Sequence, residues 1–201
     1  MIGFDLDGTL VDSRASISNA LGMAYKITTG EELDVASVAP GAPLQEILSD
    51  VGLDFDQQQL VTAEFKALYD GGICFEAIAY DGIADALDYL AAQTRLYVVT
   101  NKRKSIAEKV LEHLSLGRYF DVIDGQAEDQ FVLKQEILQR VMSQLGSSDG
   151  AYIGDTKGDV DAAIAVGLTP VFCSWGYSDA AYAPPCQIIT QPADLFRILP
   201  E

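Results

Sequence analysis

Two carboxylates lie one residue apart at the end of the first apolar run of the chain. The sequence begins "MIGFDLDGTLVDS", in which Asp5 closes the run and Asp7 follows, with Gly8 next to permit a sharp turn. Two neighbouring carboxylates repel each other unless a cation lies between them. Because hard carboxylate oxygens bind Mg²⁺ well, the spacing points to divalent-metal chemistry at the end of a buried strand.

Further polar residues follow the later apolar runs of the chain. The run at 96–99 is followed by a threonine, an asparagine and a lysine, the run at 151–153 by two acids, and a lysine begins a later helical pattern. These residues are Thr100, Asn101, Lys102, Asp155, Asp159 and Lys134. Each acid alone is more often a helix cap or a turn residue. Gathered at one sheet edge, however, they would form a site for a metal ion and a phosphate group.

The elements that would position these residues alternate between strand and helix. Short apolar runs predict strands at 2–6, 96–99, 122–123, 151–153, 170–173 and 188–189. Helical periodicity predicts helices over 83–92, 105–114, 133–145 and 159–166. Strands that alternate with helices of this length indicate an α/β fold with a Rossmann-like, doubly wound parallel sheet.

Residues 14–79 interrupt that alternation. Helical patterns occur at 16–27, 43–52 and 57–72, and no convincing strand lies between them. We therefore expect a small helical cap domain over 14–79, inserted after the first strand. The α/β core domain would comprise 1–13 and 80–201.

Four motifs of this sequence resemble those of the haloacid dehalogenase-like (HAD) superfamily of phosphohydrolases. "DLDGTL" at 5–10 resembles the first motif, "VVTN" at 98–101 the second, Lys134 the third, and "GDTKGDVDAA" at 154–163 the fourth. The helical insertion lies where C1 cap domains of that superfamily lie. "GAPLQEIL" at 41–48, "VVTNK" at 98–102 and "SWGY" at 174–177 resemble phosphoglycolate phosphatase-like members.

The resemblance implies roles for the reacting groups. Asp5 would be the nucleophile that forms an aspartyl-phosphate, which an already ionised carboxylate can do without a neighbouring base. Asp7 would protonate the leaving oxygen and then activate water. Residues two apart in a strand share a face, so both acids can reach one phosphoryl group. Lys134 would compensate the negative charge, with Lys102 as the rival for that role.

The resemblance also implies the binding groups. Phosphate oxygens would be bound by Thr9, Thr100 and the backbone of Asn101, and Lys102 is a further substrate-binding candidate. The cofactor would be Mg²⁺, held by the Asp5 carboxylate, the Asp7 backbone carbonyl and Asp155. Asp159 would bind the ion through water or support another ligand.

The function implied is a Mg²⁺-dependent phosphatase acting on a small phosphorylated metabolite. A phosphosugar mutase of the β-phosphoglucomutase type remains open, because it shares the cap and the catalytic residues. A phospho-aspartate receiver is the alternative from another class, although receivers are shorter and carry their acceptor on an interior strand. The presence of Asp7 argues against a dehalogenase, which lacks an acid at this position.

Composition limits the partners and the substrate. The formal charge of −17 would repel nucleic acid. We also expect no signal peptide, no membrane span and a cytoplasmic location with unpaired cysteines, while the oligomeric state is open. The cap carries ten acids between residues 15 and 80 against Lys26 and Lys66. This imbalance predicts a substrate other than a small dianionic acid such as phosphoglycolate, unless these acids face solvent.

Overall fold

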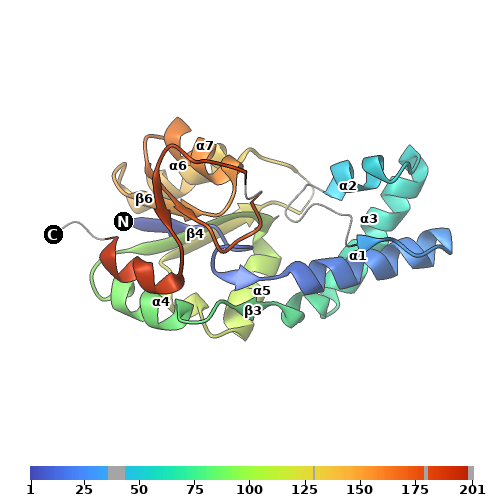
Figure 1. The fold of residues 1–201 in the computed structure, drawn as a ribbon, viewed down its shortest axis with the longest axis horizontal. Helices are drawn as coiled ribbons and strands as arrows, with labels where there is room; N and C mark the ends of the chain where they lie inside the picture. Colours follow the sequence, from blue (N-terminus) through green and yellow to red (C-terminus); the bar gives the residue numbers. More distant parts are fainter. Residues whose placement is uncertain (36–43, 129, 179–180, 199–201) are drawn as a thin grey trace. The chain divides into compact units, whose positions relative to one another are not determined.

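The computed structural model describes residues 1–35, 44–128, 130–178 and 181–198, and its ribbon is drawn in Figure 1. The chain divides into two compact units. The core unit comprises Met1–Asp12 and Ile78–Glu201, and the cap unit comprises Ser13–Ala77. Each unit is described below by itself.

The core unit contains a six-stranded parallel sheet. Its strands are β1 (Ile2–Phe4), β4 (Leu96–Arg103), β5 (Val122–Gln126), β6 (Ala151–Gly154), β7 (Thr169–Cys173) and β8 (Gln187–Ile189). Their order is β5-β4-β1-β6-β7-β8, so the chain builds outward on one side of β1 and then crosses to the other side. All six predicted strands are present, with bounds that differ by a few residues. The predicted doubly wound, Rossmann-like α/β fold is confirmed.

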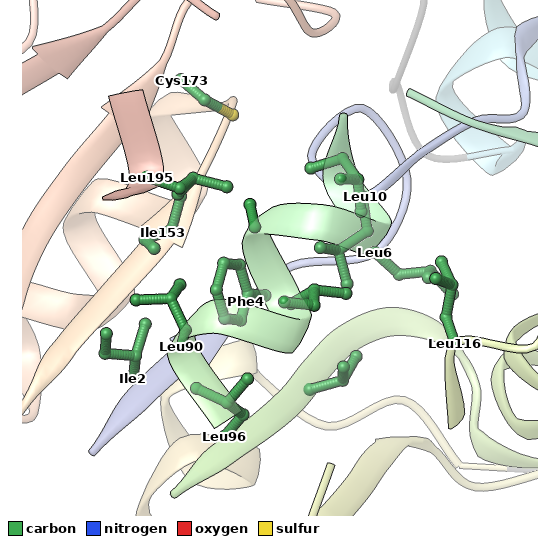
Figure 2. Packing of buried hydrophobic residues seen from close by; sticks show 14 of the residues in the cluster. Ile2, Phe4, Leu6, Leu10, Leu90, Leu96, Leu116, Ile153, Cys173 and Leu195 are labelled. Carbon is green, nitrogen blue, oxygen red and sulfur yellow. The ribbon is translucent and has the colours of Figure 1, made fainter. Parts of the chain in front are cut away.

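Helices cover both faces of this sheet. They are α4 (Ile83–Ala91), α5 (Lys104–His113), α6 (Lys134–Leu145) and α7 (Lys157–Ala165), with the short helices η3 (Gly117–Tyr119) and η4 (Pro192–Arg197). Alternate residues of β4 enter two separate hydrophobic clusters. Leu96 and Val98 pack with α4 and α5, whereas Tyr97 and Val99 pack with α6 and α7. Figure 2 shows the first cluster around Phe4 and Leu90.

The carboxyl end of β1 opens into a tight turn. Gly8 has φ +86°, a conformation that side chains rarely adopt, as expected for the turn after Asp7. The strands β4 and β6 flank β1 in parallel register, with Phe4 opposite both Val98 and Ile153. Residues that follow these three strands therefore meet at one edge, where the strand order reverses and α/β proteins bind ligands.

A small antiparallel ribbon forms where the chain leaves the core unit and where it returns to that unit. It pairs β2 (Val11–Asp12) with β3 (Ile78–Ala79), and neither strand was predicted. Both strands lie at the borders of the helical insertion, outside the alternation of strands and helices that the sequence predicts. Because β3 pairs with β2, residues 78 and 79 belong to the core unit rather than to the predicted cap.

The cap unit is helical, as predicted for the insertion. It contains α1 (Arg14–Thr29), α2 (Leu44–Asp50), α3 (Phe55–Asp70) and the short helix η2 (Ile73–Glu76). Asp54 begins α3 with a capping box, in which its carboxylate accepts from the Gln57 backbone N–H at 2.8 Å. Leu21, Leu48 and Val61 pack together in its core. The first residue of the helix predicted at 43–52, and residues 41–43 of the "GAPLQEIL" stretch, lie outside the described residues.

Candidate active site

Three buried carboxylates converge at the edge formed by β1 and β6. Asp5 follows β1, Asp155 follows β6, and Asp159 lies in the first turn of α7. One oxygen from each of the three lies within 4.8 Å of the other two. All three are almost fully removed from water, with Asp155 0% exposed. The structure therefore brings together acids that are 150 residues apart in the sequence.

Asp155 is held by neighbours on both of its oxygens. The Thr9 hydroxyl donates to Oδ1 at 3.0 Å, and the Tyr177 backbone N–H donates to Oδ2 at 2.7 Å. Gly8 and Gly176 approach so closely that a Cβ on either would lie 2.2 Å from an atom of Asp155. Thr9 was expected to bind phosphate, but its side chain is buried and directed at Asp155. The Thr9 hydroxyl therefore helps to orient this carboxylate, and its expected contact with phosphate stays a prediction.

Lys134, the first residue of α6, joins two of the carboxylates. Its Nζ lies 3.0 Å from Asp5 Oδ1 and 2.5 Å from Asp159 Oδ1. The other oxygen of Asp159 accepts from the Thr156 backbone N–H at 2.9 Å, within the capping box of α7. Both oxygens of Asp159 are therefore engaged by the protein. This arrangement suits the supporting role expected for Asp159 better than direct metal ligation.

The two rival lysines contact different acids. Lys102, near the end of β4, donates from Nζ to Asp7 Oδ1 at 2.7 Å, and both side chains are largely buried. Lys134 instead contacts Asp5. The sequence treated these lysines as alternatives for one role, whereas the structure gives each acid of the "DLD" stretch its own lysine.

Thr100 and Asn101 lie on β4 beside this cluster. Thr100 is buried, and its Oγ1 accepts from the Lys102 backbone N–H at 3.2 Å. Asn101 is exposed. Tyr152 of β6 also binds this strand, because its hydroxyl donates to the Val99 carbonyl at 2.6 Å. The phosphate-binding roles expected for Thr100 and Asn101 stay predictions.

The electrostatics of the cluster resist ionisation. Burial raises the pKa of Asp5 to about 8, against the attraction of Lys134 and with further repulsion from the neighbouring acids. Burial also raises the pKa of Asp155 to about 7, helped by Asp159 and opposed by the hydrogen bonds from Tyr177 and Thr9. Burial alone would lower the pKa of Lys134, but Asp159 and Asp5 outweigh it and raise that pKa. Protein cations alone therefore compensate the carboxylates incompletely.

The cluster fits a divalent metal ion. Asp5 Oδ1 is fully buried and accepts no hydrogen bond among the described residues, although it lies 3.0 Å from Lys134 Nζ. Its one cationic neighbour, the Lys134 ammonium group, is shared with Asp159 and so compensates this buried carboxylate only in part. Asp155 offers a second carboxylate whose orientation is already fixed. A hard cation would satisfy the first and compensate both.

The sequence did not predict the role of Gln126, which anchors the loop that leads to Lys134. Gln126, the last residue of β5, binds the backbone of Val132 twice: its Nε2 donates to the carbonyl at 2.7 Å, and its Oε1 accepts from the N–H at 2.8 Å. Val132 lies two residues before Lys134. A glutamine at a strand end carries no signal of this kind, because the partner follows only from the path of the loop.

A sequence model of the haloacid dehalogenase-like hydrolase family matches residues 2–172. The chain is 31% identical over 188 residues to the tyrosine-protein kinase PtkA of Mycobacterium tuberculosis, covering 90% of this chain. It spans only 64% of the length of that relative. It is also 32% identical over 194 residues to a phosphoglycolate phosphatase of Pseudomonas fluorescens, covering 89% of this chain and 70% of that one.

Solved structures share the fold. A haloacid dehalogenase-like hydrolase from Streptococcus pneumoniae superposes with a TM-score of 0.89 at 27% identity, covering 98% of this chain and 96% of that one. No helix among the described residues is long and apolar enough to cross a membrane.

Proposed function

Because the chain belongs to the haloacid dehalogenase-like hydrolase family, we propose that it is a Mg²⁺-dependent phosphatase that hydrolyses a small phosphate monoester through an aspartyl-phosphate. The expected membership, including the likeness to phosphoglycolate phosphatases, is confirmed by the family match and the relatives. The observation that supports the proposal is that Asp5, Asp155 and Lys134 lie close together and are buried. Burying such a cluster of charges is costly, which favours a functional role for it.

The first step would be attack by an Asp5 carboxylate oxygen on phosphorus. The new O–P bond forms as the bond from phosphorus to the leaving oxygen breaks. Asp7 would give its proton to that oxygen. Lys134, already 3.0 Å from Asp5, would stay charged and balance the negative charge on the phosphoryl group.

The second step would release phosphate. Asp7, now a carboxylate, would accept a proton from water as the water oxygen attacks phosphorus. The O–P bond to Asp5 breaks, and Asp5 returns as a carboxylate. Lys102 contacts Asp7 and would hold its side chain in place through both steps.

The proposal includes a requirement for Mg²⁺. Asp5 and Asp155 would hold the ion, with the Asp7 backbone carbonyl as a further ligand. When bound, Mg²⁺ would neutralise charge on the phosphoryl oxygens. Thr9 and Tyr177 would keep Asp155 aimed at it.

The test is phosphate release from a panel of phosphate monoesters with Mg²⁺ and with a chelator. Wild type should release phosphate only with the metal, and Asp5→Asn should reduce kcat by at least about 10³-fold, because an amide is no nucleophile. Asp56→Asn, an exposed acid of the cap unit, is the matched control. Full activity in Asp5→Asn would refute the mechanism.

The same reactions distinguish the alternatives. An isomerised sugar phosphate in place of free phosphate would favour the mutase. The similarity to proteins named tyrosine-protein kinase makes transfer to protein a further candidate. Labelled phosphate that ends on tyrosine rather than in solution would favour that reaction. The receiver is set aside because the family match spans the helical insertion.

A further inference from the structure

A mostly apolar pocket of about 240 Å³ lies in the core unit directly beside the candidate site. Phe131, Leu133 and Ala162 supply its apolar wall, and Lys134 and Asn101 also line it. Lys134 therefore belongs to both places: its side chain borders the pocket, while its Nζ lies 3.0 Å from Asp5. The pocket therefore adjoins the reacting carboxylate through the Lys134 side chain.

The apolar wall is exposed although its backbone is anchored. Phe131 is 74% exposed and Leu133 is 50% exposed, which is unusual for large apolar residues so close together. Val132 between them is bound on both its N–H and its carbonyl by the Gln126 side chain. Upstream in the same loop, Glu128 accepts from Arg103 at 3.0 Å. These contacts hold Phe131 and Leu133 at the pocket without covering them.

The charges of the pocket disfavour an anionic occupant. Among the described residues that line it, Lys134 is the only cation, and two carboxylates already engage its ammonium group. The one acid that lines it, Asp161, is paired with Lys157 at 2.5 Å. A carboxylate on a substrate would therefore meet no available positive charge among the described lining residues, whereas an apolar group would cover Phe131 and Leu133.

We propose that this pocket binds the leaving group of the substrate, and that this group is an uncharged aromatic or branched aliphatic moiety. The inference rests on the proposed phosphatase function and specifies its substrate class. The phosphoryl group would lie at Asp5 and the apolar part against Phe131.

Benzyl phosphate and glycerol 2-phosphate test this inference, because both release an uncharged alcohol, one with an apolar ring and the other with polar hydroxyl groups. Wild type with Mg²⁺ should show a higher kcat/KM for benzyl phosphate. Phe131→Ala should lower that value about tenfold, mostly through KM, and change the value for glycerol 2-phosphate less than about threefold. Phe131→Leu should retain most of the preference. Ile188→Ala, at an exposed apolar residue of β8, is the matched control.

Two results would overturn the inference. The first is an equal kcat/KM for the two esters, or a preference for 2-phosphoglycolate over benzyl phosphate. The second is an equal loss on both esters in Phe131→Ala with an unchanged melting temperature, because a leaving-group contact must discriminate. In either case Mg²⁺-dependent hydrolysis would still stand. If neither ester nor any other monoester were hydrolysed, the proposed function itself would fail.

Discussion

The carboxylates of the candidate site in the core unit differ from those of the cap unit in their exposure to water. In the core unit, Asp5, Asp155 and Asp159 are buried together and are bound by Lys134, Thr9 and backbone N–H groups. In the cap unit, most acids are exposed, among them Glu31, Glu32, Asp34, Asp50, Asp54, Asp56 and Glu76. Acidic side chains therefore occur in two different environments. Water compensates the charges of the exposed cap acids, whereas only protein groups and a metal can compensate those of the buried site acids.

This difference bears on the substrate prediction. The exposure of most cap acids matches the alternative that they simply face solvent. The charge of the cap is then a weak guide to the substrate, and the argument for an uncharged leaving group depends more on the pocket beside Lys134. Four experiments test the contrast between the two sets of acids.

The largest effect is expected from removing the lysine that pairs with the buried site acids, compared with removing a lysine that pairs with an exposed cap acid. Lys134→Met should lower kcat by at least about 10²-fold and destabilise the protein by about 3–5 kcal/mol, because it leaves two buried carboxylates without their cation. Lys26→Met, which breaks an exposed pair with Glu32, should cost less than about 1 kcal/mol. Thermal or denaturant unfolding measures both. Similar losses in the two variants would erase the contrast.

The pH dependence of stability should follow the core acids. The pKa of Asp5 is raised to about 8 and that of Asp155 to about 7, so between about pH 4 and pH 8 the native state binds more protons than the unfolded chain. In chelator, the melting temperature should therefore fall by about 3 °C or more from about pH 5.5 to about pH 8. Mg²⁺ should restore it more at the higher pH.

Two variants assign that slope to the core. Asp155→Asn should flatten the fall in chelator, because one group with a raised pKa is gone. Asp56→Asn in the cap unit should leave the slope as in wild type. A slope that survives Asp155→Asn unchanged would mean that other groups cause it.

The orientation of Asp155 should have a smaller effect. Thr9→Val removes the hydroxyl that donates to Oδ1 and should raise the Kd for Mg²⁺ about tenfold. Thr29→Val is the control, since that hydroxyl binds a backbone carbonyl within the cap helix α1. Calorimetric titration with Mg²⁺ measures both. An unchanged Kd in Thr9→Val would show that Tyr177 alone is sufficient to hold Asp155.

The smallest effect is expected from a structural acid of the cap. Asp54→Ala removes the cap of α3 and should cost about 1 kcal/mol of stability. Asp56→Ala, in the first turn of the same helix, should cost less, because its carboxylate forms no capping bond. Both variants should keep kcat/KM within about twofold of wild type. A large loss of activity in Asp56→Ala would give that cap acid a part in catalysis.

Much of the fold could be read from local patterns. The alternation of short apolar runs with helical periodicity predicted every strand of the parallel sheet. The ribbon of β2 and β3 was missed, since both strands lie at the borders of the helical insertion, outside that alternation. That omission also displaced the predicted end of the cap, where Ile78 and Ala79 pair with the core.

The site residues were chosen by type, but their partners were not predictable. Nothing in the local sequence of Thr9 distinguishes a phosphate ligand from a group that binds Asp155, because the two residues lie 146 positions apart. No feature of the sequence around Gln126 predicted that its side chain binds the backbone of Val132. Local spacing encodes hydrogen bonds within a turn or a helix, whereas these pairings arise only when strands from distant parts of the chain pack together.

The sequence by itself determined the chemistry on offer: two carboxylates at a strand end, a glycine turn after them, and acids and lysines at the ends of other elements. The tertiary structure decided how these groups are shared. It pairs Lys134 with Asp5 and Lys102 with Asp7, directs Thr9 at Asp155, and leaves Phe131 exposed beside Lys134. The reason is physical: residue type and spacing fix what a group can do, while burial and long-range packing fix which neighbour compensates its charge.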